Sequence, residues 1–325
     1  MAAPLLNRNS VVLVKAEGTY GTDSTPVVGT DPVLCTVPQM SLDAQVLDRS
    51  IAVGYLSPNA PVIGKKLYGC TFGVEFKSQT AALNGINSDP IALDDLLRCS
   101  GWSPTYTLET GNNNDGYVIY NPISTSIESA TLYVFTGKEV KHIITGAYNN
   151  WTIDIPAGGY AMMNCDIKGI YNAPTDTTAG AVTTESDVPV PIESLSLAFG
   201  AITGQVVRNL TISANNEIVE RADVNSADGF KGLRLTGRKP TLKWKMEKPL
   251  VATWSPYNVM DIGTQYSTTF TIGATTGQKI LVTAPKLTLT SVQESDDAGI
   301  VMLDVEGVCA RSSSAGNDEL TFKFF

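Results

Sequence analysis

Alternation of apolar and polar residues with a period of two is the commonest pattern along this chain. It is clearest at residues 194–199, 287–290 and 303–306, and residues 131–135 form a continuous β-favouring run. A period of two sends successive side chains to opposite faces of a strand, so each segment has one apolar and one polar face. The pattern therefore predicts a mainly β protein whose sheets are buried on one face.

One segment breaks this pattern and predicts a helix. Residues 90–99 carry apolar positions at helical spacing. Asp89 is placed to cap the helix, Pro90 suits its first turn, and Gly101 follows as a stop signal. Residues 111–116 are rich in Asn and Gly, which indicates a turn or an exposed loop.

Three short segments recur in the same order in the two halves of the chain. They are 46–49 with 218–221, 71–77 with 241–247, and 166–170 with 304–308. The order of the three segments is preserved, and the distance between the copies shrinks along the chain, which favours an internal duplication with shorter loops in the second copy. The alternative is that apolar and polar residues alternate similarly in the two halves by chance. The predicted organisation is an arm (1–30), a first domain (31–177), a linker (178–190) and a second domain (191–325).

Charge and composition limit the partners. Charged residues make up 17% of the 325 residues, below the quarter usual in soluble proteins, so much of the surface is expected to face partners. The net charge of −9 argues against tight binding of a nucleic acid backbone. The sequence predicts no membrane segment and no signal peptide, and hence synthesis in a cytoplasm.

Catalytic and metal-binding chemistry finds few suitable residues. His142 is the single histidine, and the five cysteines are widely spaced, so we expect buried free thiols and neither a cofactor nor a metal. The acidic cluster Glu294, Asp296 and Asp297 is expected to be a solvated turn rather than a cation site. The protein is therefore predicted not to be an enzyme.

Residues 14–26 resemble the N-terminal signature of phage tail tube proteins. Further landmarks in family order are residues 96–102, 169–176, 236–240, 283–286, 296–300 and 314–321. The resemblance implies tandem tail-tube β-sandwich or barrel domains with a short helix each. They would assemble into stacked rings with a continuous inner β-barrel, through which the genome passes during ejection. The fold is shared with type VI secretion tube proteins, whose single-domain subunits are about half this length.

The expected partners follow from this resemblance. Copies of the chain would form trimeric rings with pseudo-sixfold symmetry, a hexamer being the alternative. Other tail proteins (tape measure, terminator and distal tail) would contact the tube, and DNA would pass without specific binding. The expected location is the virion tail, after synthesis in the host cytoplasm. The alternatives are a secretion-system tube protein and a virion-surface β-sandwich adhesin or carbohydrate-binding module.

Polar strand faces are the candidate lumen lining, and an ordinary solvated outer face is the alternative. The candidate lumen-facing residues are Glu75, Lys77, Asp166, Lys168, Lys243, Lys245, Glu247, Asp304 and Glu306. A lumen of net negative potential is predicted, because it would repel DNA. The apolar run Val11, Val12, Leu13 and Val14 is the candidate inter-ring arm, a frayed terminus being the alternative.

Overall fold

A computed structural model gives the structure of the chain. It describes residues 4–78, 93–107, 116–183, 188–193, 195, 197–199, 204–226, 229–273 and 278–325. Strands dominate and helices are short, so the predicted mainly β class is confirmed. No helix in the described part of the chain is long and apolar enough to cross a membrane.

The elements of the first half begin with a short 3-10 helix, η1 (Asn7–Asn9). They continue with β1 (Val11–Ala16), β2 (Pro32–Val33), β3 (Gln39–Leu47), β4 (Val62–Glu75), α2 (Asp94–Arg98), β5 (Trp102–Thr107), β6 (Tyr117–Pro122), β7 (Ala130–Thr136), β8 (Val140–Pro156), β9 (Met162–Tyr171) and β10 (Thr175–Asp176). The second half contains β11 (Ala198–Phe199), β12 (Val207–Ser213), β13 (Asn216–Ala222), β14 (Phe230–Arg238), β15 (Thr241–Glu247), α3 (Pro256–Ile262), β16 (Gln265–Ile272), β17 (Ile280–Asp297), β18 (Ile300–Ala310) and β19 (Thr321–Phe324).

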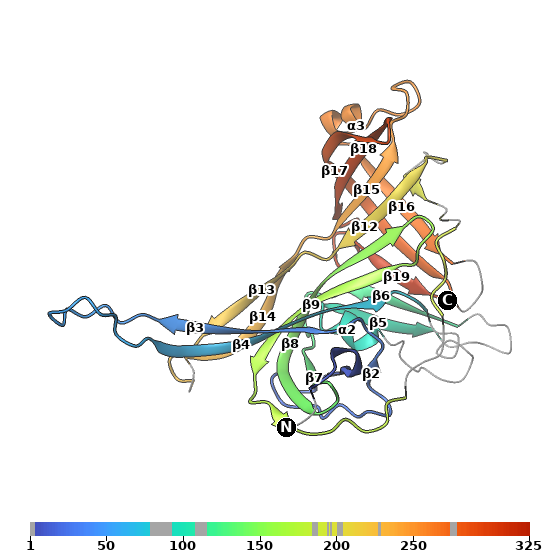
Figure 1. Ribbon diagram of the computed structural model, residues 1–325. Coiled ribbons are helices and arrows are strands. Elements are labelled where there is room, and N and C mark those ends of the chain that lie inside the picture. The colour runs from blue at the N-terminus through green and yellow to red at the C-terminus, as the bar shows by residue number, and fades with distance from the viewer. Residues whose placement is uncertain are drawn as a thin grey trace.

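Eight strands form one continuous antiparallel ladder in the order β3–β4–β9–β8–β12–β15–β18–β17. The first four strands come from the first half of the chain and the last four from the second. The two long hairpins, β3–β4 and β13–β14, extend to the same side of the molecule, while β15 to β18 rise away from them (Figure 1). β13 and β14 form a separate two-stranded sheet, and the other described strands form one large sheet that is not a closed barrel, so the barrel form of the expected domains does not occur in the single chain.

The same strand arrangement occurs in both halves. β4 lies between β3 and β9, and β15 lies between β12 and β18. The repeated segments match Asp166 with Asp304. Asp166 pairs with Thr71 on β4, whereas Asp304 pairs with Lys245 on β15, so the register makes Lys245 the counterpart of Thr71. The sequence alignment, which matched Thr71 with Thr241, is therefore wrong. Thr241 and Lys245 are an even number of positions apart on β15. The mismatch therefore leaves unchanged which residues of the strand face the core.

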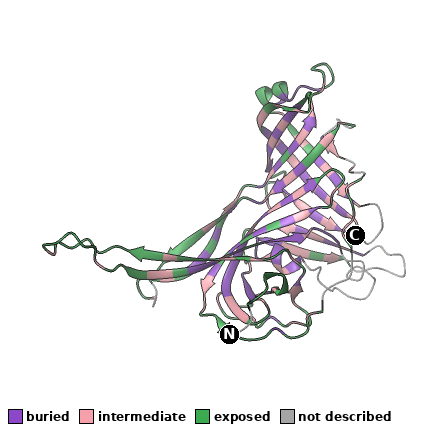
Figure 2. Cartoon of the chain, in the orientation of Figure 1, coloured by how far each residue is buried: buried purple, intermediate pink, exposed green. Residues whose placement is uncertain are grey.

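Aromatic side chains form a core shared by both halves. Phe322 on β19 lies 5.6 Å from both Phe76 and Trp151, measured between ring centroids. β19 pairs with β6 of the first half and with β17 of the second half. Buried positions follow the central strands, and exposed positions gather toward the hairpin tips (Figure 2). β19 therefore joins the two halves into one hydrophobic core.

Among the described residues, each half contains one short α-helix. Leu96 and Leu97 of α2 are fully buried, which confirms a helix within the predicted range. Asp89, Pro90 and residues 111–115 lie outside the described residues. α3 is a helix of the second half, which the family resemblance implied without giving its position; Ser255 caps it and Gly263 ends it in a left-handed conformation.

The apolar run at Val11–Val14 lies in the chain's own sheet. β1 pairs with β7 and β2, and Val12, Leu13 and Val14 are at most 2% exposed. The structure therefore corrects the expected inter-ring arm formed by Val11, Val12, Leu13 and Val14. Hydrophobic burial drives these residues inward as expected, but their partner is β7 of the same chain.

Candidate functional site

One face of the eight-strand ladder is polar and crosses from the first half to the second. Asp166 and Lys168 on β9 are exposed on it. Asn164 donates a hydrogen bond to Asp154 on β8 at 2.9 Å, and Thr211 on β12 donates to the same carboxylate at 3.1 Å. Asp154 therefore connects the polar faces of the two halves.

The face continues over β15 and β18, where predicted site residues of opposite charge pair. Lys243 lies opposite Glu306, and Lys245 lies opposite Asp304. Lys245 also lies 4.0 Å from Asp297 at the end of β17. Opposite charges on directly paired positions favour this register. The structure thus gathers six predicted residues on one surface: Asp166, Lys168, Lys243, Lys245, Asp304 and Glu306.

The remaining three predicted residues lie at strand ends. Lys77 follows β4, is 7% exposed, and donates to Glu75 at 2.9 Å. Glu247 is the last residue of β15 and pairs with Met302. Burial and pairing bring Glu75 and Lys77 together, but Lys77 is not on an open surface of the single chain.

Two strand edges of the ladder remain open. β3 pairs with β4 alone, and residues 289–297 of β17 pair with β18 alone, as far as the described residues show. Unpaired N–H and C=O groups on an edge recruit further strands. The chain therefore presents one open edge at each end of its sheet. Periodicity could not reveal this feature, because it does not show which strands lie at an edge.

The β3–β4 hairpin also exposes apolar side chains. Leu42 and Val46 are 53% and 55% exposed. Others on the hairpin and its connecting loop are Leu47, Ile51, Tyr55, Leu56, Val62 and Ile63. Contiguous exposed apolar surface on a protein marks an interaction site.

The corresponding hairpin of the second half is covered. Leu233 and Leu235 on β14 are buried against Tyr148 and Leu67 of the first half. The backbone N–H of Leu233 donates to the Tyr20 hydroxyl at 2.5 Å. The β13–β14 hairpin of the second half is thus covered by side chains of the first half.

Asn216 at the base of this hairpin holds the two halves together. Its side-chain amide donates to the backbone carbonyls of Ser100 and Asn149, both at 2.9 Å. Its backbone N–H donates to the Asn150 side chain at 2.9 Å. Three bonds from one residue fix the hairpin on the first half.

Glu17, in the N-terminal signature, is buried and accepts four hydrogen bonds. The donors are Gly21 N (2.7 Å), Gly146 N (2.7 Å), Ser129 Oγ (2.5 Å) and Thr131 Oγ1 (2.8 Å). A carboxylate offers enough lone pairs for four donors. Glu17 therefore ties the loop after β1 to β7 and β8, which gives the signature a structural role.

Replacing Glu17 by glutamine is expected to destabilise the protein by about 2–3 kcal/mol. The amide keeps one acceptor oxygen and turns an N–H₂ group toward buried donors. Urea denaturation followed by tryptophan fluorescence measures the change. The exposed Glu193 provides the matched control, since Glu193→Gln should leave stability unchanged. Equal stability of the two variants would contradict the role given to Glu17.

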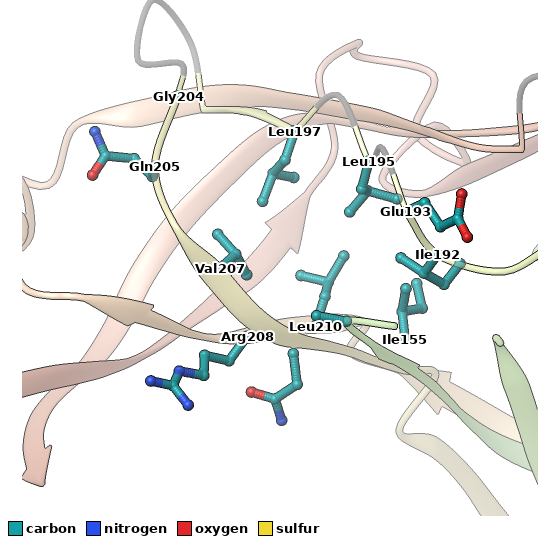
Figure 3. Close-up of a pocket in the computed structure, with 12 residues that line it drawn as sticks. Ile155, Ile192, Glu193, Leu195, Leu197, Gly204, Gln205, Val207, Arg208 and Leu210 are labelled. Carbon is teal, nitrogen blue, oxygen red and sulfur yellow. The ribbon is translucent and has the colours of Figure 1, made fainter. Parts of the chain in front are cut away.

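A cavity of about 440 Å³ lies beside the junction of the two halves, between β12 and residues 192, 193, 195 and 197. Leu195, Leu197, Val207 and Leu210 point into it, whereas Arg208 points away (Figure 3). Arg208 pairs with Asp297 at 3.1 Å. The described lining of the cavity is mainly aliphatic, and Glu193 and Arg208 are its charged residues.

Four of the reactive side chains considered above are buried or held by structural contacts. His142 lies 3.3 Å from the Tyr68 hydroxyl, and burial lowers its pKa. Burial also raises the pKa of the Cys70 and Cys309 thiols to about 12. Glu294 accepts a hydrogen bond from Tyr257 at 2.7 Å and another from Lys248. No group of three metal-binding side chains occurs among the described residues.

Comparison with known proteins identifies the family. No curated protein matches the chain. The model of the phage tail tube protein family matches residues 7–309, from η1 into β18. Because this match covers most of its length, the chain belongs to the phage tail tube protein family.

Proposed function

We propose that the chain is the structural subunit of a phage tail tube and polymerises as stacked rings that form the conduit for genome ejection. The observation that carries this proposal is the ladder of eight strands with an open edge at each end. A sheet with two open edges can continue through further copies until it closes on itself. The family supports a structural role and a place in the virion tail.

We further propose that the two halves are tandem copies of one tail-tube domain. The repeated order of β3, β4 and β9 in β12, β15 and β18 supports this, as does the helix that follows β4 and β15. Domain limits of 31–177 and 191–325 with a linker at 178–190 are kept as part of the proposal.

A trimer is the favoured ring. Each chain contributes two similar domains joined by a continuous sheet, so three chains present six similar units around the axis. A ring of six chains is the alternative. The chain's low fraction of charged residues suits extensive contact between copies.

The polar face is proposed to line the lumen. It carries the acidic residues Asp154, Asp166, Asp304 and Glu306 and the basic residues Lys168, Lys243 and Lys245. A surface without excess positive charge does not hold the phosphate backbone, so DNA passes without specific binding. Glu75, Lys77 and Glu247 would then lie toward the rims of this surface, and the lumen would have a net negative potential.

Other tail proteins (tape measure, terminator and distal tail) are the proposed further partners, because a tube needs a defined length and two ends. Assembly would follow synthesis in the host cytoplasm. No observation on the described residues favours the adhesin, carbohydrate-binding or secretion-tube alternatives over this role.

Negative-stain electron microscopy of the purified protein tests the function. Rings or tubes of uniform bore are the expected result. A monomer that stays dispersed at high concentration, with or without glycan binding, would contradict it. Three-dimensional reconstruction of the rings then distinguishes three from six chains.

A further inference from the structure

The junction between the two halves is a strand pair that fixes a register. Residues 209–213 of β12 pair antiparallel with residues 152–156 of β8, and we call this pair the in-chain joint. Thr211 lies opposite Asp154, and Ser213 lies opposite Thr152. Ala214 N donates to the carbonyl of Trp151 at 3.0 Å. Since hydrogen-bonded and non-hydrogen-bonded pairs alternate, the pairs at 211 and 213 are of the closer, non-hydrogen-bonded kind.

The β8–β9 hairpin matches the β17–β18 hairpin in register. Gly169 and Gly307 each lie opposite a one-residue bulge. A Cβ on Gly169 would lie 3.0 Å from the carbonyl oxygen of Thr145, and one on Gly307 would lie 3.1 Å from that of Thr288. Ile170 directly follows Gly169 and pairs with Thr145, and Val308 directly follows Gly307 and pairs with Thr288. Thr288 is therefore the counterpart of Thr145.

The pairs at the ends of the two hairpins agree with this correspondence. Asp154 pairs with Met162, and Asp297 pairs with Ile300. Asp154 follows Thr145 at the same distance along its strand as Asp297 follows Thr288. Asp297 therefore corresponds to Asp154, and by the same count Ser295 corresponds to Thr152.

The other side of the joint has a counterpart in β3. Gln39 on β3 pairs with Thr71 on β4, and Asn209 on β12 pairs with Lys245 on β15. A register shift of one residue comes just before each of these two pairs. By this correspondence Ser41 matches Thr211, and residues 40–44 match residues 210–214. Leu210, Ile212 and Ala214 are at most 1% exposed within the joint. Their counterparts are more open to solvent: Met40 and Ala44 are half-buried, and Leu42 is 53% exposed.

We propose that β3 of one chain pairs antiparallel with the end of β17 of a second copy, in the register of the in-chain joint. Ser41 then lies opposite Asp297 of the neighbouring chain, and Asp43 lies opposite its Ser295. This inference rests on the proposed function and specifies which surface each subunit offers to the next.

Side-chain chemistry on the polar face supports this register. Thr211 donates to Asp154 at 3.1 Å in the in-chain joint, and Ser41 facing Asp297 recreates a hydroxyl opposite a carboxylate. Asp43 facing Ser295 gives a second such pair. The tight turn at residues 298–299 ends the β17 edge sooner than the longer loop ends β8, so the intermolecular ladder is shorter.

Disulfide trapping tests the register. The double variant Ser41→Cys with Asp297→Cys places thiols at a non-hydrogen-bonded pair, where Cα atoms lie about 4.5 Å apart, within disulfide reach. Oxidation of the assembled protein should give covalent multimers on a non-reducing gel. The off-register control, Ser41→Cys with Gln293→Cys, separates the thiols by about 13 Å and should stay monomeric on the gel.

The same samples distinguish the inference from the function. Electron microscopy before oxidation reports whether rings or tubes form. Two results would overturn the register while leaving the tube function intact. In the first, Ser41→Cys/Asp297→Cys forms rings or tubes but no cross-links. In the second, the off-register control cross-links equally well. Absence of assembly by the wild-type chain overturns both. Thr211→Cys with Asp154→Cys is the positive control, since it should form a disulfide within one chain without an increase in mass.

Discussion

Replacement of Leu42 by proline is expected to give a folded chain that no longer assembles. In the proposed register Leu42 corresponds to Ile212, whose backbone groups point across the in-chain joint. The N–H of Leu42 therefore points toward the open edge. Proline is tolerated on an edge strand where its missing N–H faces solvent, but it removes a hydrogen bond and adds bulk where another chain would pair.

The matched control is Ile212→Pro, the same change within the in-chain joint. There the loss of a buried ladder bond should cost about 1–3 kcal/mol and lower the unfolding temperature. Leu42→Pro should keep a wild-type circular dichroism spectrum and melting curve as a monomer. Size-exclusion chromatography with light scattering reads out assembly. Leu42→Pro tubes indistinguishable from wild type would show that this edge does not pair.

Truncation of Phe322 to alanine is expected to reduce the free energy of unfolding by about 3–5 kcal/mol. Its ring is fully buried and contacts Phe76, Trp102 and Trp151. Removal leaves a cavity among large rigid rings that cannot close in around it. The loss should appear in denaturant unfolding monitored by tryptophan fluorescence.

Phe325→Ala provides the control, because Phe325 is only partly buried and contacts the Lys279 and Lys323 side chains. It should cost well under half of the Phe322 effect. If both variants lose the same stability, the shared aromatic core does not depend on Phe322 as the structure indicates.

Strand faces could be predicted from the sequence because a period of two separates core from surface. Leu287 and Leu303 are apolar positions of two alternating segments, 287–290 and 303–306, and both are buried. The opposite faces carry polar residues for the same reason, and six of the candidate lumen-facing residues share one surface of the single chain. Alternation is a local property, and local properties are visible in the sequence.

Long-range partners could not be predicted in the same way. Val12 and Leu13 signalled a need for burial, but hydrophobicity does not say which strand supplies the contact. The slip that matched Thr71 with Thr241 instead of Lys245 left every face unchanged, so no pattern could detect it. Finding α3 was possible, since a capping serine, an early proline and a terminal glycine are ordinary helix boundary signals.

The position of β19 has a consequence for the order of events during translation. Phe322 and Phe324 complete the aromatic cluster around Trp102, Tyr120 and Trp151, yet they lie at the far end of the chain from it. The N-terminal half must therefore leave the ribosome with part of its interior unfilled and wait for residues 321–324. Contacts this distant in sequence form late and slowly, so each nascent subunit passes through an exposed state before it can join a growing polymer.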